Sequence, residues 1–412
     1  MRGSRALFAL SFAAAVGACS LDLGKTPYAC TDGVTCPDGF TCRATVCVAD
    51  GEKAPDAARP MRVTYINSAE MYWFDSKADG ATLVVNDGFS PGAKGIFEIH
   101  VGADGAVTNP KKLLDFGGEF PVSSGIVALD EGHYGALTLN FPAEDESTSR
   151  VQLYSLEREA AGEPAKKLLF TRDLPYVGGY EPPYIAAIVH AGQLVVALTN
   201  PANGGRVEIE TRSLDGAKLD GFDVALPDGL LPLSGDCLLW QTPSGKLVLR
   251  LGLDAISLAE IDLVSKTATF LGTAPGTPIY ALDGASDLAI VWLEVDDAGT
   301  AQYVVRDRDA VEIARTPKSG FQDGLEPYTA AGAPTSGALL APLSEDAAFA
   351  KLGVSSISAT GTLTPVAGFD RPAEDTLYSA RAHVRDGRAY VAWTAFHDAL
   401  MDLWVASSEV AQ

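Results

Sequence analysis

The sequence predicts an all-β fold made of repeated four-stranded units, and three features support this. Residues 61–412 consist of short apolar runs broken by Gly, Pro, Asn and Asp, with almost no helical periodicity. An aromatic residue opens an apolar run at Tyr184, Tyr280, Tyr328 and Tyr378, which are 96, 48 and 50 residues apart. Each unit of about 50 residues holds four such runs. Four strands repeated at this period are typical of a β-propeller.

The predicted strands follow in order along the chain. The first unit is predicted to contain 71–75, 82–86, 96–101 and 111–116. The third contains 184–190, 193–199, 206–213 and 222–226, and the fifth contains 280–283, 288–295, 302–306 and 311–315. Tight hairpins are predicted at Asp104-Gly105, Asp215-Gly216 and Thr360-Gly361. Units two and four fit the pattern least well.

The two ends of the repeat region predict how the ring closes. The last unit has three strands, 380–384, 388–396 and 402–408, and lacks a fourth, whereas Arg62–Ile66 is one strand too many before the first unit. If Arg62–Ile66 is the outer strand of the last blade, no sheet edge is left open there. We therefore expect seven four-stranded blades. A β-sandwich and a six- or eight-bladed ring are the alternatives.

The N-terminus indicates export. Arg2 and Arg5 precede a short apolar run at 6–15, and small residues then lead to Cys19. The run is too short to span a bilayer, which takes about 20 residues, and is typical of a cleaved signal. The arrangement resembles the signal of bacterial lipoproteins, which implies cleavage after residue 18 and acylation of Cys19. Ser20 resembles the outer-membrane sorting signal of enteric bacteria. An ordinary secretory signal is the alternative.

A cysteine-rich module is predicted at residues 19–47. Four cysteines fall within 18 residues, spaced C-x5-C-x5-C-x4-C, namely Cys30, Cys36, Cys42 and Cys47. In an exported chain this favours two disulfides, and the lack of a C-x2-C pair or nearby histidine disfavours zinc. The segment resembles small modules that follow the lipid anchor in some bacterial lipoproteins. Of the three possible pairings, we prefer Cys30–Cys42 with Cys36–Cys47. Cys237 is expected to be a buried, inert thiol.

Residues 48–60 are predicted to be a linker, because Gly, Pro and charged residues dominate and little could pack. Residues 61–412 then form the propeller. The chain carries a formal charge of −22, which becomes −24 once residues 1–18, with two arginines and no acid, are removed. Such a charge repels phosphate backbones, so nucleic acid is not an expected partner.

No catalytic, metal or cofactor motif is predicted. Gly88-Phe89-Ser90-Pro91-Gly92 matches a serine nucleophile pattern, but Pro91 cannot donate the N–H that the oxyanion hole requires. No two of the five histidines have metal-ligand spacing, and neither glycine-rich phosphate-binding pattern occurs.

One recurring feature suggests a binding site. Segments that enter the innermost strands carry an acid, an aromatic residue and, except in the segment from Glu374 to Tyr378, a proline. In a propeller these segments meet around the channel mouth, so a ring of carboxylates and tyrosines could bind a cation, an amine or sugar hydroxyls. The alternative is that these are turn and rim residues without a ligand. The candidate residues are Glu119, Glu181, Tyr184, Tyr280, Glu326, Tyr328, Glu374 and Tyr378.

The sequence therefore predicts an exported propeller lipoprotein, lipid-anchored in the bacterial cell envelope, most simply at the outer membrane, that binds a partner. An envelope protein or polysaccharide would be that partner. The alternative function is a glycan hydrolase or lyase that uses carboxylates at the channel mouth. A third possibility is an assembly scaffold, similar to propeller lipoproteins that help to build outer membranes.

Overall fold

The structure is a computed structural model. It describes residues 28–29, 40–43, 46–49, 61–65, 69–77, 79–87, 95–108, 110–116, 120–141, 148–175, 185–200, 206–226, 237–252, 256–285, 287–295, 301–316, 329–330, 338–340, 351–370, 376–397 and 400–410. Every regular element in these ranges is a β-strand. The described residues include no helix long and apolar enough to cross a membrane.

Six sheets have four strands each, joined antiparallel in chain order. The first three are β5 (Ala69–Asp75), β6 (Ala81–Asp87), β7 (Gly95–Val101) and β8 (Lys111–Asp115); β9 (Phe120–Ala128), β10 (His133–Phe141), β11 (Thr148–Glu157) and β12 (Lys166–Pro175); and β13 (Ile185–His190), β14 (Gln193–Asn200), β15 (Arg206–Arg212) and β16 (Lys218–Ala225). We call these blades 1, 2 and 3.

The next three sheets are blades 4, 5 and 6. They consist of β17 (Cys237–Gln241), β18 (Leu247–Leu251), β19 (Ser257–Asp262) and β20 (Thr267–Phe270); β21 (Thr277–Asp283), β22 (Leu288–Val295), β23 (Ala301–Asp307) and β24 (Glu312–Arg315); and β25 (Thr329–Ala330), β26 (Ala338–Leu340), β27 (Lys351–Ile357) and β28 (Leu363–Asp370).

The remaining sheet, which we call the terminal sheet, combines both ends of the described chain. Its seven strands run in the order β2-β3-β1-β4-β31-β30-β29. They are β1 (Tyr28–Ala29), β2 (Phe40–Arg43), β3 (Val46–Ala49), β4 (Met61–Tyr65), β29 (Thr376–Arg385), β30 (Arg388–His397) and β31 (Leu400–Glu409).

The terminal sheet corrects one expectation and confirms another. Seven blades of four strands were expected, but the structure has six, because β1, β2 and β3 extend the terminal sheet to seven strands. β1 pairs with β4 on the side away from β31, so the sheet continues beyond β4. The strand pattern of residues 61–412 did not indicate this extension. The expected pairing of the two ends is confirmed: β4 pairs antiparallel with β31, with Tyr65 opposite Asp402.

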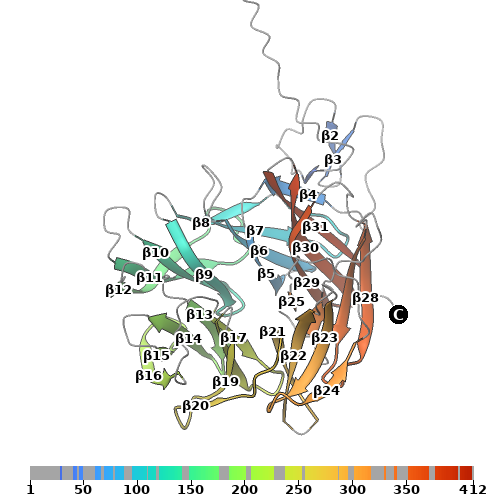
Figure 1. Cartoon of the computed structure of the whole chain (residues 1–412). Coiled ribbons are helices and arrows are strands. Elements are labelled where there is room, and N and C mark those ends of the chain that lie inside the picture. Colours follow the sequence, from blue (N-terminus) through green and yellow to red (C-terminus); the bar gives the residue numbers. More distant parts are fainter. Residues whose placement is uncertain are drawn as a thin grey trace, which may run out of the picture.

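The sheets are arranged around a common centre, to which each blade contributes its first strand (Figure 1). First strands of neighbouring sheets contact one another, as β9 does with β13 and β29 does with β5. The fold is therefore an all-β propeller. Its core lies between the sheets: Met71 and Trp73 of blade 1, for example, pack with Tyr390 and Leu403 of the terminal sheet.

Tight turns join the strands on one face of the ring, which we call the turn face. It holds the turns between first and second strands and between third and fourth strands. The expected hairpins at Gly105, Gly216 and Gly361 are confirmed, because all three have positive φ, at 82°, 93° and 78°. Cys237 is 4% exposed, which confirms the expected burial of its side chain.

Candidate functional site

Most of the candidate residues at the channel mouth lie outside the described residues. These are Glu119, Glu181, Tyr184, Glu326, Tyr328 and Glu374. Tyr378 lies in β29, but its side chain is outside the description. The carboxylate ring, and the hydrolase function that would use it, therefore stay predictions.

Tyr280 is the candidate whose side chain the structure describes. It lies in β21, is 8% exposed, and its ring centroid is 6.2 Å from that of Trp240 in blade 4. An aromatic pair at this separation contributes to packing. Tyr280 thus belongs to the core between blades 4 and 5.

The cysteine-rich module is described in part. Cys42 in β2 lies opposite Cys47 in β3, whereas Cys19, Cys30 and Cys36 are outside the described residues. The disulfide pairing and the lipidation of Cys19 therefore stay predictions, as does the division of the chain at residues 48–60.

Three polar residues that the sequence analysis did not select meet at the inner strands of blade 1 and the terminal sheet. The hydroxyl of Tyr72 donates a hydrogen bond to Oε2 of Glu70, at 3.0 Å. Burial, followed by the charge of Glu70, raises the pKa of Tyr72 well above its ordinary value, while the nearby Arg381 acts in the opposite direction. For the other blades, the sequence analysis selected an acid followed by an aromatic residue at the start of the innermost strand. The same pattern in β5 would have selected Glu70 and Tyr72.

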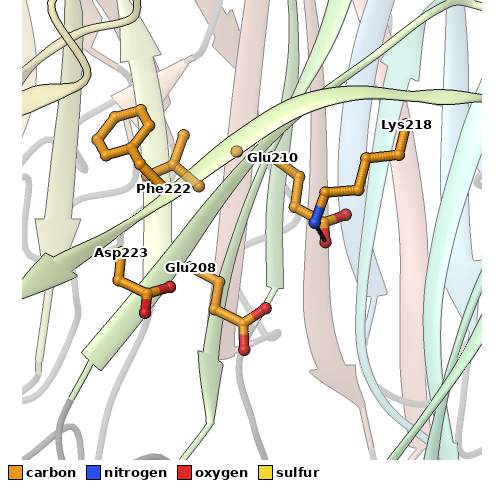
Figure 2. Close-up of a pocket in the computed structure, with 7 residues that line it drawn as sticks. Glu208, Glu210, Lys218, Phe222 and Asp223 are labelled. Carbon is orange, nitrogen blue, oxygen red and sulfur yellow. Dashed lines mark hydrogen bonds and ion pairs between the residues drawn. The ribbon is translucent and has the colours of Figure 1, made fainter.

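A polar pocket of about 290 Å³ opens on blade 3, and Figure 2 shows its lining. Its walls come from the two outer strands, β15 and β16, where Glu208 lies opposite Asp223 and Glu210 lies opposite Gly221. Position 221 favours glycine because β15 lies close to it: a Cβ there would be 2.9 Å from the carbonyl oxygen of Ile209. The lining residues are Glu208, Ile209, Glu210, Lys218, Gly221, Phe222 and Asp223.

A neighbouring blade holds the pocket acids in place. Arg172 of β12 in blade 2 places Nη1 2.6 Å from Oε2 of Glu208 and 3.0 Å from Oε1 of Glu210. Within blade 3, Arg212 and Lys218 also bind Glu210, at 2.6 and 2.8 Å. The guanidinium of Arg212 lies 3.8 Å from the ring centroid of Phe170 in blade 2. The carboxylates are thus fixed before any ligand arrives.

The electrostatics of the pocket favour ionised acids. Burial works to raise the pKa of Glu210, but hydrogen bonds from Lys218 and Arg212 outweigh it, so this pKa lies below its ordinary value. The hydrogen bond to Glu208 raises the pKa of Arg172. Glu210 is therefore a hydrogen-bond acceptor at neutral pH and is unsuited to donate a proton as a general acid.

The sequence carried a signal for this pocket that was interpreted only as a strand. Arg206, Glu208, Glu210 and Arg212 alternate with apolar residues along β15, so they share one face. Such a face is ordinarily solvated. Nothing in the local pattern indicates that Arg172, 38 positions before Glu210, covers it. In the described ranges, including the pocket, no three His, Cys, Asp or Glu residues are grouped as metal ligands.

Comparisons with known proteins give a resemblance in fold alone. No family model and no curated protein matches the chain. A subtype N10 neuraminidase-like protein of A/little yellow-shouldered bat/Guatemala matches at 10% identity and a TM-score of 0.43, covering 84% of this chain and 98% of its own. Trypanosoma rangeli sialidase matches at 10% identity and 0.45, covering 82% of this chain and 54% of its own, so the chain spans about half of it. An α-L-arabinanase of Penicillium chrysogenum matches at 10% identity and 0.45, covering 76% and 98%. At these values none of the three supports an inference about activity.

Proposed function

We propose that this protein is an exported β-propeller lipoprotein, anchored in the bacterial cell envelope through Cys19, that binds a ligand and catalyses no reaction. We further propose that the pocket on blade 3 is its ligand site. The observation that carries this proposal is that Arg172 holds Glu208 and Glu210 in fixed positions at the pocket wall. Binding groups that are already in place lose little conformational entropy when a ligand arrives.

The chemistry of the lining favours a polyhydroxylated ligand. Glu208 and Asp223 accept hydrogen bonds, and Lys218 donates them. Sugar hydroxyls both donate and accept hydrogen bonds, so they can pair with acceptors and donors of this kind. An oligosaccharide segment of an envelope polysaccharide is therefore the ligand class that we propose.

Binding is favoured over hydrolysis at this pocket. Glycoside hydrolysis needs one carboxylic acid with a raised pKa beside a second carboxylate. Glu210 has a lowered pKa and is bound by three cations. Burial raises the pKa of Glu98 above its ordinary value, as a general acid would require. However, Glu98 is only 5% exposed, so a substrate could not reach it. It also accepts the backbone N–H of Glu159 at 3.0 Å, so it is held within the packing of blades 1 and 2.

We also infer that β29, β30, β31 and β4 serve as a seventh blade. Two observations support this: β4 pairs with β31, and β29 contacts both β5 and β25. In this proposal the ring has seven blades, and β1, β2 and β3 are added to the outer edge of the last one.

A matched pair of variants tests the pocket. Glu208→Gln removes a carboxylate that is 14% exposed and 2.6 Å from Arg172. Glu294→Gln removes one that is also 14% exposed and 2.8 Å from Arg315, but in blade 5, away from the pocket. We expect E208Q to weaken binding of neutral oligosaccharides by about tenfold, or about 1.4 kcal/mol, while E294Q binds as the original protein does. Calorimetric titration against a series of oligosaccharides measures this. Equal affinities for both variants would reject the pocket as the site.

A separate experiment tests the anchor. Cells that express the full chain are fed an alkyne fatty acid, and label incorporation is compared with that of a Cys19→Ser variant. We expect label and membrane fractionation for the original chain and loss of both for the variant. An unlabelled original chain would reject the anchor without affecting the pocket.

A further inference from the structure

The N-terminal strands are part of the terminal sheet. β1 pairs antiparallel with β3, where Tyr28 lies opposite Cys47, and parallel with β4, where Tyr28 lies opposite Arg62. β4 in turn pairs with β31. The strands β1, β2 and β3 are therefore joined by hydrogen bonds, through β4, to the outer edge of the ring (Figure 1).

The remaining chain is too short to reach far. Nine residue steps separate Cys19 from Tyr28. An extended chain spans at most about 3.3–3.6 Å per residue, so Cys19 lies within about 30 Å of β1. A globular chain of about 350 residues has a radius of gyration of about 20 Å, so a compact body of this size is about 50 Å wide, which exceeds the reach of Cys19. A lipid on Cys19 can therefore reach one part of the rim much more easily than the opposite part.

We propose that the rim formed by β2, β3, β1 and β4 faces the lipid surface and that the disc stands on edge. This inference rests on the lipid anchor proposed above and adds an orientation to it. The membrane-facing surface is then the outer edge of the terminal sheet, and both flat faces of the ring are open to the aqueous side.

Charge argues against the alternative in which the turn face lies flat on the bilayer. The turns on that face carry exposed aspartates, alongside exposed lysines such as Lys77 and Lys266. The aspartates include Asp104, Asp130, Asp215, Asp262, Asp309 and Asp386. A flat orientation would press this face against anionic headgroups, which repel carboxylates. The strands β1, β2, β3 and β4 contain no Asp or Glu, so standing on edge brings no carboxylate of these strands to the lipid.

The orientation has a consequence for the pocket. Blade 3 is separated from the terminal sheet by two blades on one side and three on the other, in the order of the chain. Its outer strands, β15 and β16, thus lie on the part of the rim remote from β4 (Figure 1). An upright disc would present the proposed oligosaccharide site away from the membrane.

Two labels on the turn face distinguish the orientations. Glu409 ends β31, the strand beside β4, and Val264 lies in the turn after β19 in blade 4, where it is 95% exposed. Both positions end a third strand, so they lie on the same face of the disc. A fluorescent amino acid is placed at 409 or at 264, and energy transfer to an acceptor dye on lipid headgroups is measured in phosphatidylcholine–phosphatidylglycerol vesicles.

The measurement is made in two ways, so that the anchor and the orientation are tested separately. One sample is the full chain acylated in cells. The other is the chain from residue 19 onward with Cys19→Ser and an N-terminal hexahistidine tag, held on nickel-chelating lipid. An unacylated first sample rejects the anchor, and the second sample still reports the orientation.

We expect several-fold higher transfer at position 409 than at position 264 in both samples. Tyr28→Pro, which removes the backbone N–H of β1, should reduce this difference, whereas Tyr28→Phe should preserve it. Equal transfer at both positions in the unaltered chain, whether strong from a flat disc or weak from a freely tumbling one, would overturn the proposal.

Discussion

The imidazole Nε2 of His383 lies 3.0 Å from Oδ1 of Asp75, although the two residues are 308 positions apart in the chain. The backbone oxygen of Asp75 also accepts a hydrogen bond from the guanidinium of Arg158 in blade 2. A single residue at the end of β5 therefore joins three consecutive sheets. Arg385 strengthens the same junction by donating to the backbone oxygens of Ser76 and Gly80.

This junction should make stability depend on pH. Burial lowers the pKa of His383 below its ordinary value, while Asp75 acts in the opposite direction. The unfolded chain then binds this proton more readily than the folded protein. The stability that neutral His383 confers is thus fully present above the unfolded pKa of about 6.5 and is lost as the pH falls below it.

The urea midpoint is therefore expected to fall between about pH 7.5 and about pH 5.5, on either side of that unfolded pKa. His383→Gln should show a smaller fall. His133→Gln, which alters an exposed histidine paired with Asp130, should show the same fall as the original protein. If the urea midpoint fell equally in the original protein and in both variants, the pH effect would come from groups other than His383.

Arg158 should resist replacement by lysine. Its side chain is 7% exposed, donates to the backbone oxygens of Asp75 and Asp130, and lies 4.8 Å from the ring centroid of Tyr134. A lysine ammonium cannot donate to both backbone oxygens in this geometry and also stack its charge on the ring of Tyr134. We expect Arg158→Lys to lower the free energy of unfolding by about 2 kcal/mol. The exposed Arg150, which pairs with Asp173, provides the control, and Arg150→Lys should change it by less than about 0.5 kcal/mol.

Two glycines in equivalent turns should differ in their tolerance of alanine. Gly80 and Gly387 both have positive φ, 77° and 74°, and each lies just before the second strand of its sheet. A Cβ at Gly80 would be 2.1 Å from the backbone oxygen of Val101, whereas a Cβ at Gly387 would meet nothing within 4 Å. We expect Gly387→Ala to cost about 1 kcal/mol from backbone strain alone. Gly80→Ala should cost about 3 kcal/mol or more, because the backbone must also shift. Thermal unfolding of both variants at the same pH checks this.

Breaking the pairing of β4 with β31 should promote association. Thr64 lies opposite Leu403 in this pairing. Proline at position 64 would remove an N–H and crowd the neighbouring strand, and an exposed edge of β31 could then pair with another chain. We expect Thr64→Pro to lose about 3 kcal/mol of stability and to form oligomers in light scattering. Thr64→Val should stay as the original protein, and a monomeric Thr64→Pro would contradict the prediction.

Strand positions were predictable where local pattern decides them. In blade 3, alternation of apolar and polar residues and the turn at Asp215-Gly216 predicted strands close to those found. Blade 4 fitted less well for a physical reason. All five residues of β18 are buried, so the strand shows no alternation, and β20 has the sequence Thr-Ala-Thr-Phe, with little apolar content.

Contacts between sheets were not predictable in the same way. β1 is a two-residue strand held by a parallel partner, so no periodicity marks Tyr28–Ala29 as part of a sheet. Likewise, the acids of the pocket were visible as a polar strand face. Their partner Arg172 reaches them only because of the register between blades 2 and 3, which a single sequence does not contain.

β31 lies between β30 and β4 and so links the strands from the two ends of the described chain. A premature stop that removed Leu400–Glu409 would leave β4, and the three strands attached to it, without their hydrogen-bonded link to β30. Synthesis must therefore pass residue 409 before β4 can pair with β31. Nascent and truncated chains carry two open strand edges until then, and proteases and chaperones can recognise such edges.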